Sequence, residues 1–229
     1  GASGDIDCAR SDAGTICAIW DWTMSGSEHI WASVSTDGSQ SWSWQTRVTD
    51  AAEASRWNPR IACDSLGVFY AVWWDSRGGT EPWACYFSRS SDGGETWLWP
   101  NVRISDEGRA TGEPVIASDA LGSRLICVFK DTEQDLIYSS YSTDGGSTWS
   151  ADQVVSVPSA GDASAPAVSW VGGQTYVAAW GDGWVSDSCN HYASFTLDGG
   201  ETWMQPCIPI PDNNTGMMST SLRIVSLDS

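Results

Sequence analysis

A ten-residue phrase that returns at a nearly fixed interval is the feature that most constrains how this chain can fold. The four copies read SVSTDGSQSW, SRSSDGGETW, SYSTDGGSTW and SFTLDGGETW. Their aspartates, which lie 55, 52 and 54 residues apart, are Asp37, Asp92, Asp144 and Asp198. A regular interval of this length indicates a repeat architecture in which each repeat is one supersecondary unit.

Each interval predicts a small antiparallel sheet of about four strands. In the second unit, the alternating segment NPRIACD is followed by a turn at Leu66 and Gly67, a buried segment VFYAVWW, and a third segment ACYFSRS before the aspartate turn. The other units follow the same plan, so the sequence predicts an all-β fold of four-stranded antiparallel units. The expected units span residues 5–50, 58–105, 112–158 and 164–211.

The chemistry of the turn explains why the phrase recurs. An aspartate carboxylate can accept hydrogen bonds from backbone N–H groups across a turn, and the glycines that follow it permit positive φ. We therefore interpret the four aspartates as structural residues that close hairpins, and not as catalytic groups. The tryptophans that end the copies begin the outgoing strands, and they are Trp42, Trp97, Trp149 and Trp203.

The composition excludes several classes of function. The chain has 229 residues, of which 41% are hydrophobic and 16 are tryptophan, so it can bury a sizeable core. Its formal net charge of −18 makes nucleic acid and anionic membrane surfaces poor partners. Membrane insertion is not expected, because the longest apolar segments, such as RLICVF, are only strand-sized. The first residues, GASGDIDC, do not have the pattern of a secretion signal.

One pair of cysteines has a spacing that predicts a disulfide bond near the start of the chain. If Asp12 and Ala13 form a two-residue hairpin turn, Cys8 lies opposite Cys17. That position is a pair without backbone hydrogen bonds, where side chains approach most closely and a disulfide can form. The alternative is that these cysteines are buried free thiols.

A second predicted disulfide joins Cys189 and Cys207, which are equally distant from the turn aspartate Asp198. Two such bonds would indicate an oxidising compartment, so we expect a secreted protein that is extracellular or at the cell surface. The triplet NNT at Asn213 is a glycosylation acceptor, which agrees with that expectation. The pairing of three further cysteines stays open, and these are Cys63, Cys85 and Cys127.

The pattern S-x-D-x-G-x-T-W, repeated over essentially the whole chain, resembles the Asp box, or bacterial neuraminidase repeat, of sialidases and sialidase-like β-propellers. The resemblance implies four-stranded blades around a central axis. It also implies that each Asp box lies between the third and fourth strands of its blade, at the periphery. The tail, residues 219–229, resembles the first strand of a fifth blade; the alternative is a compact four-bladed propeller whose last strand joins the first blade.

The resemblance also implies where a catalytic site would lie. Sialidases of this family grip a substrate carboxylate with three arginines, and use an aspartate acid and a tyrosine nucleophile paired with a glutamate. Arg60 matches the first arginine, although Ala62 replaces the proline of that motif. Arg77, Asp75 and Glu81 match the loop before the acid. No arginine triad can be assembled, and the alternative for Arg60 and Arg77 is an ion pair at the surface or between blades.

Two hypotheses of function follow. The first is a secreted, non-catalytic propeller that binds a glycan or an extracellular protein, or assembles with itself. Its candidate sugar-stacking residues are Trp22, Trp83, Trp99 and Trp184. The second is a sialidase-like glycoside hydrolase whose other catalytic residues lie in further blades; we favour the first, because Asp boxes attest to architecture alone. No cofactor is expected: calcium would suit the acidic composition, but no calcium-binding spacing is present, and neither His29 nor His191 lies in a metal-ligand pattern.

Overall fold

The structure is a computed structural model that describes residues 3–24, 27–50, 54–77, 82–157, 162–185, 188–205 and 207–210. The described residues form sixteen β-strands, which confirms the predicted all-β fold. Among these residues there is no helix with the length and apolar character needed to span a membrane.

The strands form four antiparallel sheets of four strands each, which we call blades 1 to 4 in chain order. Blade 1 contains β1 (Ser3–Arg10), β2 (Ile16–Met24), β3 (Ser27–Ser35) and β4 (Thr46–Arg47). Blade 2 contains β5 (Arg56–Cys63), β6 (Phe69–Asp75), β7 (Ala84–Ser90) and β8 (Val102–Arg103). Blade 3 contains β9 (Thr111–Ser118), β10 (Leu125–Asp131), β11 (Leu136–Ser142) and β12 (Gln153–Val154). Blade 4 contains β13 (Asp162–Gly172), β14 (Thr175–Val185), β15 (Ser188–Thr196) and β16 (Ile208–Ile210).

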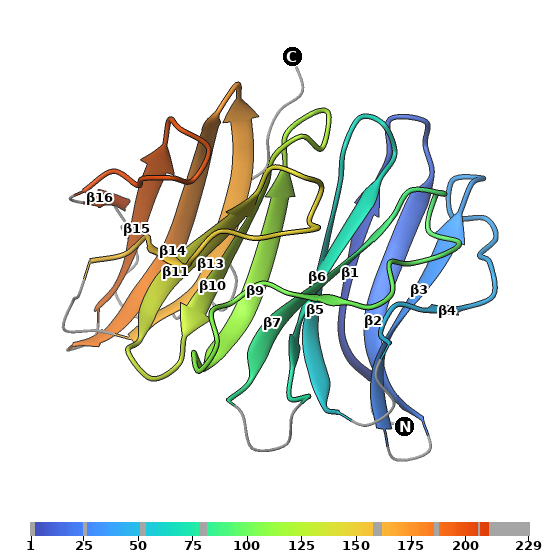
Figure 1. Cartoon of the computed structure of the whole chain (residues 1–229), viewed down its shortest axis with the longest axis horizontal. Helices are drawn as coiled ribbons and strands as arrows, with labels where there is room; N and C mark the ends of the chain where they lie inside the picture. Colours follow the sequence, from blue (N-terminus) through green and yellow to red (C-terminus); the bar gives the residue numbers. More distant parts are fainter. Residues whose placement is uncertain are drawn as a thin grey trace.

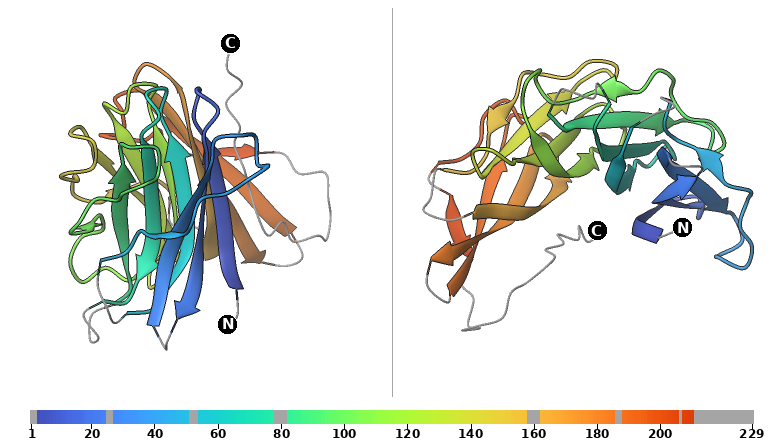
Figure 2. Two further views of the ribbon diagram at one scale, coloured as in Figure 1. Left: turned by 90° about the vertical axis from the view of Figure 1, so that its right-hand side faces the viewer. Right: turned by 90° about the horizontal axis from the view of Figure 1, so that it is seen from below.

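The blades lie side by side along an arc, as Figures 1 and 2 show. Within each blade the strands pair in chain order, so every connection is a hairpin. The first strands of neighbouring blades contact one another, which places β1, β5, β9 and β13 on the inner side of the arc. This radial arrangement of four-stranded sheets is that of propeller blades.

The strand order fixes which connections share an end of the blades. The turns between the first and second strands lie at the same end as the hairpins between the third and fourth strands, which hold the Asp boxes. We call this the Asp-box end. The connections between the second and third strands lie at the opposite end, together with the links from each blade to the next, and we call this the linker end.

The hydrophobic core lies between neighbouring blades, in three clusters. The Asp-box tryptophan of each later blade packs against the blade before it: Trp97 and Trp203 are each 8% exposed. The ring of Trp149 lies 5.3 Å from the ring of Phe87 on blade 2. Trp42 of blade 1 is 44% exposed, because no described blade precedes it.

The same packing requires glycine two residues after the Asp-box aspartate. Gly146 has a φ of 85°, and a Cβ atom there would lie 2.1 Å from a ring carbon of Phe87 on the preceding blade. Blade 1 has Ser39 at this position, with a φ of 72° and an exposed side chain. A side chain is tolerated at Ser39 because no described blade packs against this turn.

Asp92 shows how an Asp box closes its hairpin. Its Oδ1 accepts hydrogen bonds from the hydroxyl of Ser90 (2.7 Å) and from the backbone N–H groups of Glu95 (3.1 Å) and Thr96 (2.9 Å). Its Oδ2 accepts a hydrogen bond from the hydroxyl of Thr96. Partial burial raises the pKa of Asp92, but the hydrogen bonds from Thr96 and Ser90 outweigh burial and hold the pKa at about 2.

We expect Asp92→Ala to lower the free energy of unfolding by about 1–2 kcal/mol at pH 7, because the turn loses all of these hydrogen bonds. Urea denaturation measures the change. The pKa of the folded state lies below the unfolded value of 3.8, so the carboxylate stabilises the fold above that pH and its contribution is lost as the pH falls toward 2. Equal stability of the variant and the natural protein at pH 7 would show that the turn closes without the carboxylate.

The predicted disulfide between Cys8 and Cys17 is wrong, because the turn between β1 and β2 has three residues and not two. The turn ends at Gly14, which has a φ of 92°. The additional residue shifts the register by one, so that Cys8 pairs with Ala18 and Cys17 pairs with Ala9. The two cysteine side chains therefore lie on opposite faces of the sheet; Cys8 is exposed, Cys17 is buried, and both thiols are free.

The predicted disulfide between Cys189 and Cys207 is not formed either. The ladder between β15 and β16 pairs Ala193 with Ile208, the residue after Cys207. Cys207 therefore lies beside Ala193, four residues along β15 from Cys189, and not opposite Cys189. Cys207 is a buried free thiol whose sulfur lies 3.6 Å from the carbonyl oxygen of Val155. The side chain of Cys189 lies outside the described residues. Three other thiols are also free, and they are Cys63, Cys85 and Cys127.

Candidate functional site

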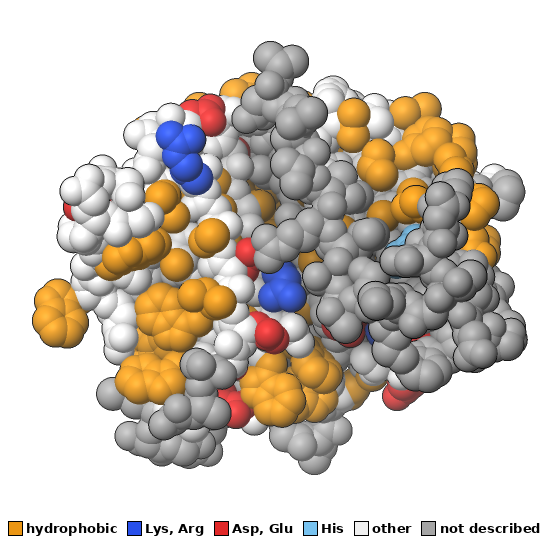
Figure 3. Space-filling model, turned by 180° about the vertical axis from the view of Figure 1, so that it is seen from behind, with side chains coloured by type: hydrophobic (Ala, Val, Ile, Leu, Met, Phe, Trp, Pro, Cys, Tyr) orange, Lys and Arg blue, Asp and Glu red, His pale blue; other side chains and the backbone are white. Residues whose placement is uncertain are grey.

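The linker end of blades 1 and 2 gathers aromatic and charged side chains. Figure 3 views the molecule from behind Figure 1, onto the inner side of the arc, and shows hydrophobic side chains gathered over the lower half of these blades with charged side chains between them. Three predicted site residues come from the linker end of blade 2, and they are Asp75, Arg77 and Trp83. This region is therefore the candidate site.

Three tryptophans of blade 2 form an aromatic cluster at this end, which we call the Trp57 cluster. Trp57 on β5 is the cross-strand partner of Trp74 on β6, and Trp83 directly precedes β7. The ring centroids of Trp74 and Trp83 are 4.5 Å apart. The ring of Trp57 lies 5.6 Å from that of Trp83 and 6.3 Å from that of Trp74. Trp57 is 43% exposed, whereas the other two rings are half-buried.

The exposed ring of Trp57 is held in place from the neighbouring blade. Its Nε1 donates a hydrogen bond of 2.7 Å to Oε2 of Glu28, at the linker end of blade 1. Tryptophan buries a large apolar ring while its N–H group makes a polar contact. A ring fixed in this way can stack on the apolar face of a ligand without losing further side-chain freedom when the ligand binds.

A β-bulge separates Trp57 from Arg60 on the inner strand. The register between β5 and β6 shifts at this point, and Asn58 has a φ of 53°. The inner strands of blades 3 and 4 also contain a bulge, with positive φ at Glu113 and Ala165. Each of these non-glycine residues costs about 1–3 kcal/mol of backbone strain. Bulges re-aim nearby side chains, so in these three blades the strained residue lies where the inner strand changes the direction of its side chains.

Arg60 does not form the ion pair that was predicted from sequence as the alternative to a role in substrate binding. Its side chain is half-buried, and its guanidinium donates a 2.8 Å hydrogen bond to the carbonyl oxygen of the adjacent Pro59. Within the part of the chain that the structure describes, the ion pairs involve other basic residues. Arg60 therefore lies on the inner strand as a cation with no carboxylate partner among those residues.

Arg77, in contrast, forms an ion pair that connects two blades. Its guanidinium lies 2.7 Å from Oδ2 of Asp75 and 2.6 Å from Oδ1 of Asp50, which belongs to the link between blades 1 and 2. The same group stacks 4.0 Å above the ring of Tyr86. These contacts occupy both terminal nitrogens of Arg77, with which it would bind a substrate carboxylate, and Arg60 and Arg77 have no common partner among the described contacts.

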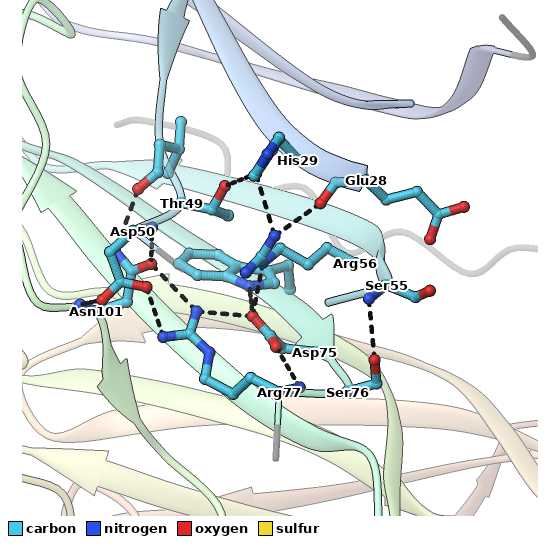
Figure 4. Close-up of polar contacts among 12 residues, drawn as sticks. Glu28, His29, Thr49, Asp50, Ser55, Arg56, Asp75, Ser76, Arg77 and Asn101 are labelled. Carbon is cyan, nitrogen blue, oxygen red and sulfur yellow. Dashed lines mark hydrogen bonds and ion pairs between the residues drawn. The ribbon is translucent and has the colours of Figure 1, made fainter. Parts of the chain in front are cut away.

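Arg56 is a central residue of this region that sequence reasoning missed. It is 0% exposed, and its Nε donates a 2.9 Å hydrogen bond to Oδ2 of Asp75. Its NH1 donates to the carbonyl oxygen of Glu28 (2.7 Å) and lies 3.1 Å from Nδ1 of His29, as Figure 4 shows. Burial raises the pKa of Asp75, but Arg77 and Arg56 outweigh burial and leave the pKa below its usual value. Burial and the charge of Arg56 lower the pKa of His29.

The remaining predicted site residues lie elsewhere. Trp99 follows an Asp box on the outer hairpin, where it is 52% exposed and Arg47 stacks 5.0 Å from its ring. Trp22 is half-buried on blade 1, with its ring 6.3 Å from that of Trp31. Outside the described residues lie Glu81, the side chain of Trp184, Asn213 and the segment 219–229. Sequence reasoning missed Trp57 and Trp74. The signal for Trp74 was its neighbour Trp73, because adjacent residues on one strand point to opposite faces and only one of the two rings can enter the same core.

The fold and the inner-side geometry define a sialidase-like β-propeller. Residues 26–224 match the BNR repeat-like domain family, and the chain belongs to this family. No curated protein matches the chain. The resemblance inferred from the Asp boxes is therefore confirmed at the level of family and fold.

Solved structures of several glycosidases share this fold. A Hadza microbial sialidase is 17% identical, with a TM-score of 0.63 over 88% of this chain and 46% of that chain. The GH93 α-L-arabinofuranosidase of Fusarium graminearum, solved with arabinobiose, is 13% identical, with a TM-score of 0.68 over 90% and 65%. A protein of unknown function from Dyadobacter fermentans is 15% identical, with a TM-score of 0.63 over 88% and 67%. The chain thus spans about half to two thirds of these structures, and the likeness shows the fold alone.

Proposed function

We propose that this chain is part of a non-catalytic, carbohydrate-binding propeller whose ligand stacks on the Trp57 cluster. The observation that carries the proposal is the exposed Trp57 ring, which is anchored through Glu28 and backed by two further tryptophans. The contacts that occupy Arg77 favour binding over catalysis, because they remove one of the candidate carboxylate-binding arginines. An extracellular location belongs to the same proposal. It rests on the glycan ligand alone, because the described cysteines are free and disulfide bonds no longer support it.

The structural neighbours support carbohydrate as the ligand class. Their names describe a sialidase and an arabinofuranosidase, and both classes of enzyme act on sugars. Sugar rings present an apolar face of C–H groups, which complements the flat face of an indole ring. The net charge of −18 favours a neutral sugar over an anionic one.

We expect Trp57→Ala to weaken oligosaccharide binding roughly five- to tenfold, because one well-ordered stacking contact contributes about 1–1.5 kcal/mol. Titration of the full chain with neutral arabino-oligosaccharides and with sialyllactose, followed by tryptophan fluorescence and calorimetry, measures the change. The matched control is Trp44→Ala, because Trp44 is 94% exposed and follows an Asp box, away from the linker end. This control should bind as the natural chain does.

Three results would contradict the proposal. Equal weakening by Trp57→Ala and Trp44→Ala would remove the Trp57 cluster as the binding surface, as would the absence of binding to every sugar tested. Release of a fluorophore from a sialoside or an arabinofuranoside by the chain would contradict the non-catalytic part. If that release disappears in Arg60→Ala, the cation on the inner strand takes part in the reaction.

A further inference from the structure

Two neighbouring blade junctions use the same pair of positions but different side chains. Asn101 directly precedes β8 and pairs with Asp50, which lies three residues after β4. Asp152 directly precedes β12 and pairs with Asp106, which lies three residues after β8. In both pairs each residue donates its backbone N–H to the side chain of the other. The first junction therefore has an amide where the second has a carboxyl group.

At the first junction, the amide of Asn101 has partners on both sides. Its Oδ1 accepts hydrogen bonds from the backbone N–H of Asp50 (2.8 Å) and from Arg77 (3.3 Å). Its Nδ2 donates to the carbonyl oxygens of Val48 (3.1 Å) and Leu98 (3.0 Å). The side chain thus bridges blades 1 and 2 with an acceptor on one side and a donor on the other.

At the second junction, only one side of the carboxyl group has partners. Oδ2 of Asp152 accepts hydrogen bonds from the backbone N–H of Asp106 (3.1 Å) and from Nε of Arg109 (2.5 Å). Oδ1 is buried without a hydrogen-bond partner, and the side chain is 0% exposed. Counted from the strand end and from the Asp box, the carbonyl groups of Ile104 and Ser150 correspond to those of Val48 and Leu98, which accept from Asn101. Oδ1 of Asp152 therefore takes the position of the donor Nδ2 of Asn101, but an ionised carboxylate oxygen cannot donate a hydrogen bond.

We propose that Asp152 carries a proton on Oδ1 in the folded chain, and that this proton makes the junction between blades 2 and 3 pH-sensitive. A protonated carboxyl group has the pattern of the asparagine amide, with one donor and one acceptor. Loss of the proton leaves a buried charge whose Oδ1 receives no hydrogen bond. An unpaired buried polar atom of this kind destabilises a fold.

The charged groups around Asp152 agree with this assignment. Burial and the negative charge of Asp106 raise the pKa of Asp152, and they outweigh the opposing hydrogen bonds and charge of the Asp106 backbone and Arg109. Arg109 is also shared with Asp131, at the end of β10, which divides its positive charge between two carboxyl groups. From β10 the buried thiol of Cys127 also lies close enough to interact electrostatically with this carboxyl group.

The sign of the pH dependence is opposite to that of an ordinary aspartate. Because the pKa in the folded state lies above the unfolded value of 3.8, the folded chain binds the proton more tightly than the unfolded chain does. The stabilisation is complete at low pH and is lost as the pH rises through the folded-state pKa. The other junction, with its amide, has no such loss.

Exchange of the two side chains tests the proposal. Asp152→Asn should raise the melting temperature of the full chain by about 2–4 °C at high pH, with no gain at low pH. Asn101→Asp should lower the melting temperature at pH 7 and give the first junction a new decline with rising pH. Melting curves followed by circular dichroism between pH 4 and pH 9 measure both effects.

The difference between the curves decides the outcome. If Asp152→Asn and the natural chain melt with parallel pH profiles, Asp152 does not bind a proton in this range and the proposal is wrong. If Asn101→Asp does not fold, the Asp152→Asn profile decides alone. A direct readout is the carboxyl carbon signal of Asp152 in nuclear magnetic resonance, which should be absent from the spectrum of Asp152→Asn and should titrate above the unfolded-state value in the natural chain.

Discussion

Asp75→Ala is expected to destabilise the chain by about 3–5 kcal/mol, because it leaves the guanidinium of Arg56 buried without its carboxylate partner. Both side chains of this pair are 0% exposed. The same carboxylate also accepts hydrogen bonds from Arg77 and from Nε1 of Trp73, so the substitution removes three hydrogen-bonded contacts at once from the linker end of blade 2. In a chain of this size the melting temperature should fall by about 10 °C.

The control for this prediction is Asp162→Ala. Asp162 pairs with Lys130 between blades 3 and 4, but its side chain is 46% exposed and Lys130 has a second partner in Asp135. Exposed pairs contribute about 0–1 kcal/mol, so the melting temperature should change by a few degrees at most. Similar losses in Asp75→Ala and Asp162→Ala would show that burial of the Arg56 pair does not determine its contribution.

Gly146→Ala is expected to destabilise the chain by about 3 kcal/mol or more. The residue combines a positive φ with a neighbour, Phe87, that already occupies the place of a Cβ atom. The left-handed conformation costs a non-glycine residue about 1–2 kcal/mol, and overpacking adds about 1–3 kcal/mol. Urea denaturation of the purified variant measures the loss.

Gly93→Ala separates the two contributions. Gly93 is the first glycine of another Asp box and has a φ of 80°, but a Cβ atom there meets nothing within 4 Å. It should lose only the conformational part, about 1–2 kcal/mol. Equal losses in Gly93→Ala and Gly146→Ala would refute close blade packing as the reason for the second glycine. Phe87→Leu, introduced with Gly146→Ala, should recover part of the additional loss.

The fold was predictable from sequence because local chemistry recurs at each repeat. The aspartate, the glycines and the alternating segments around them specify one hairpin without reference to the rest of the chain. Register was not predictable in the same way, because Gly14 can end a three-residue turn or follow a two-residue one. That difference of one residue moves Cys8 to the opposite face from Cys17.

The candidate site was less predictable, since its contacts join different blades. Arg77 was recognised as a candidate, but the carboxylate of Asp50 that helps to hold it lies in a link 27 residues earlier. Arg56 reads in sequence as an ordinary surface arginine; its burial depends on Glu28 and His29 of the previous blade. The adjacent tryptophans in VFYAVWW, Trp73 and Trp74, did carry a local signal, because one of two adjacent rings must lie on the other face of the strand from the core.

Each Asp-box tryptophan packs against the preceding blade, and this gives the array a direction. Each of blades 2 to 4 presents its Asp-box tryptophan to the preceding blade. Blades 2 and 3 also present, on the opposite face, the surface against which the tryptophan of the next blade packs. A tandem duplication of such a blade would copy both features at once. The new unit would carry both the Asp-box tryptophan and the surface that receives such a tryptophan, so one duplication adds a unit that has the parts of both joints.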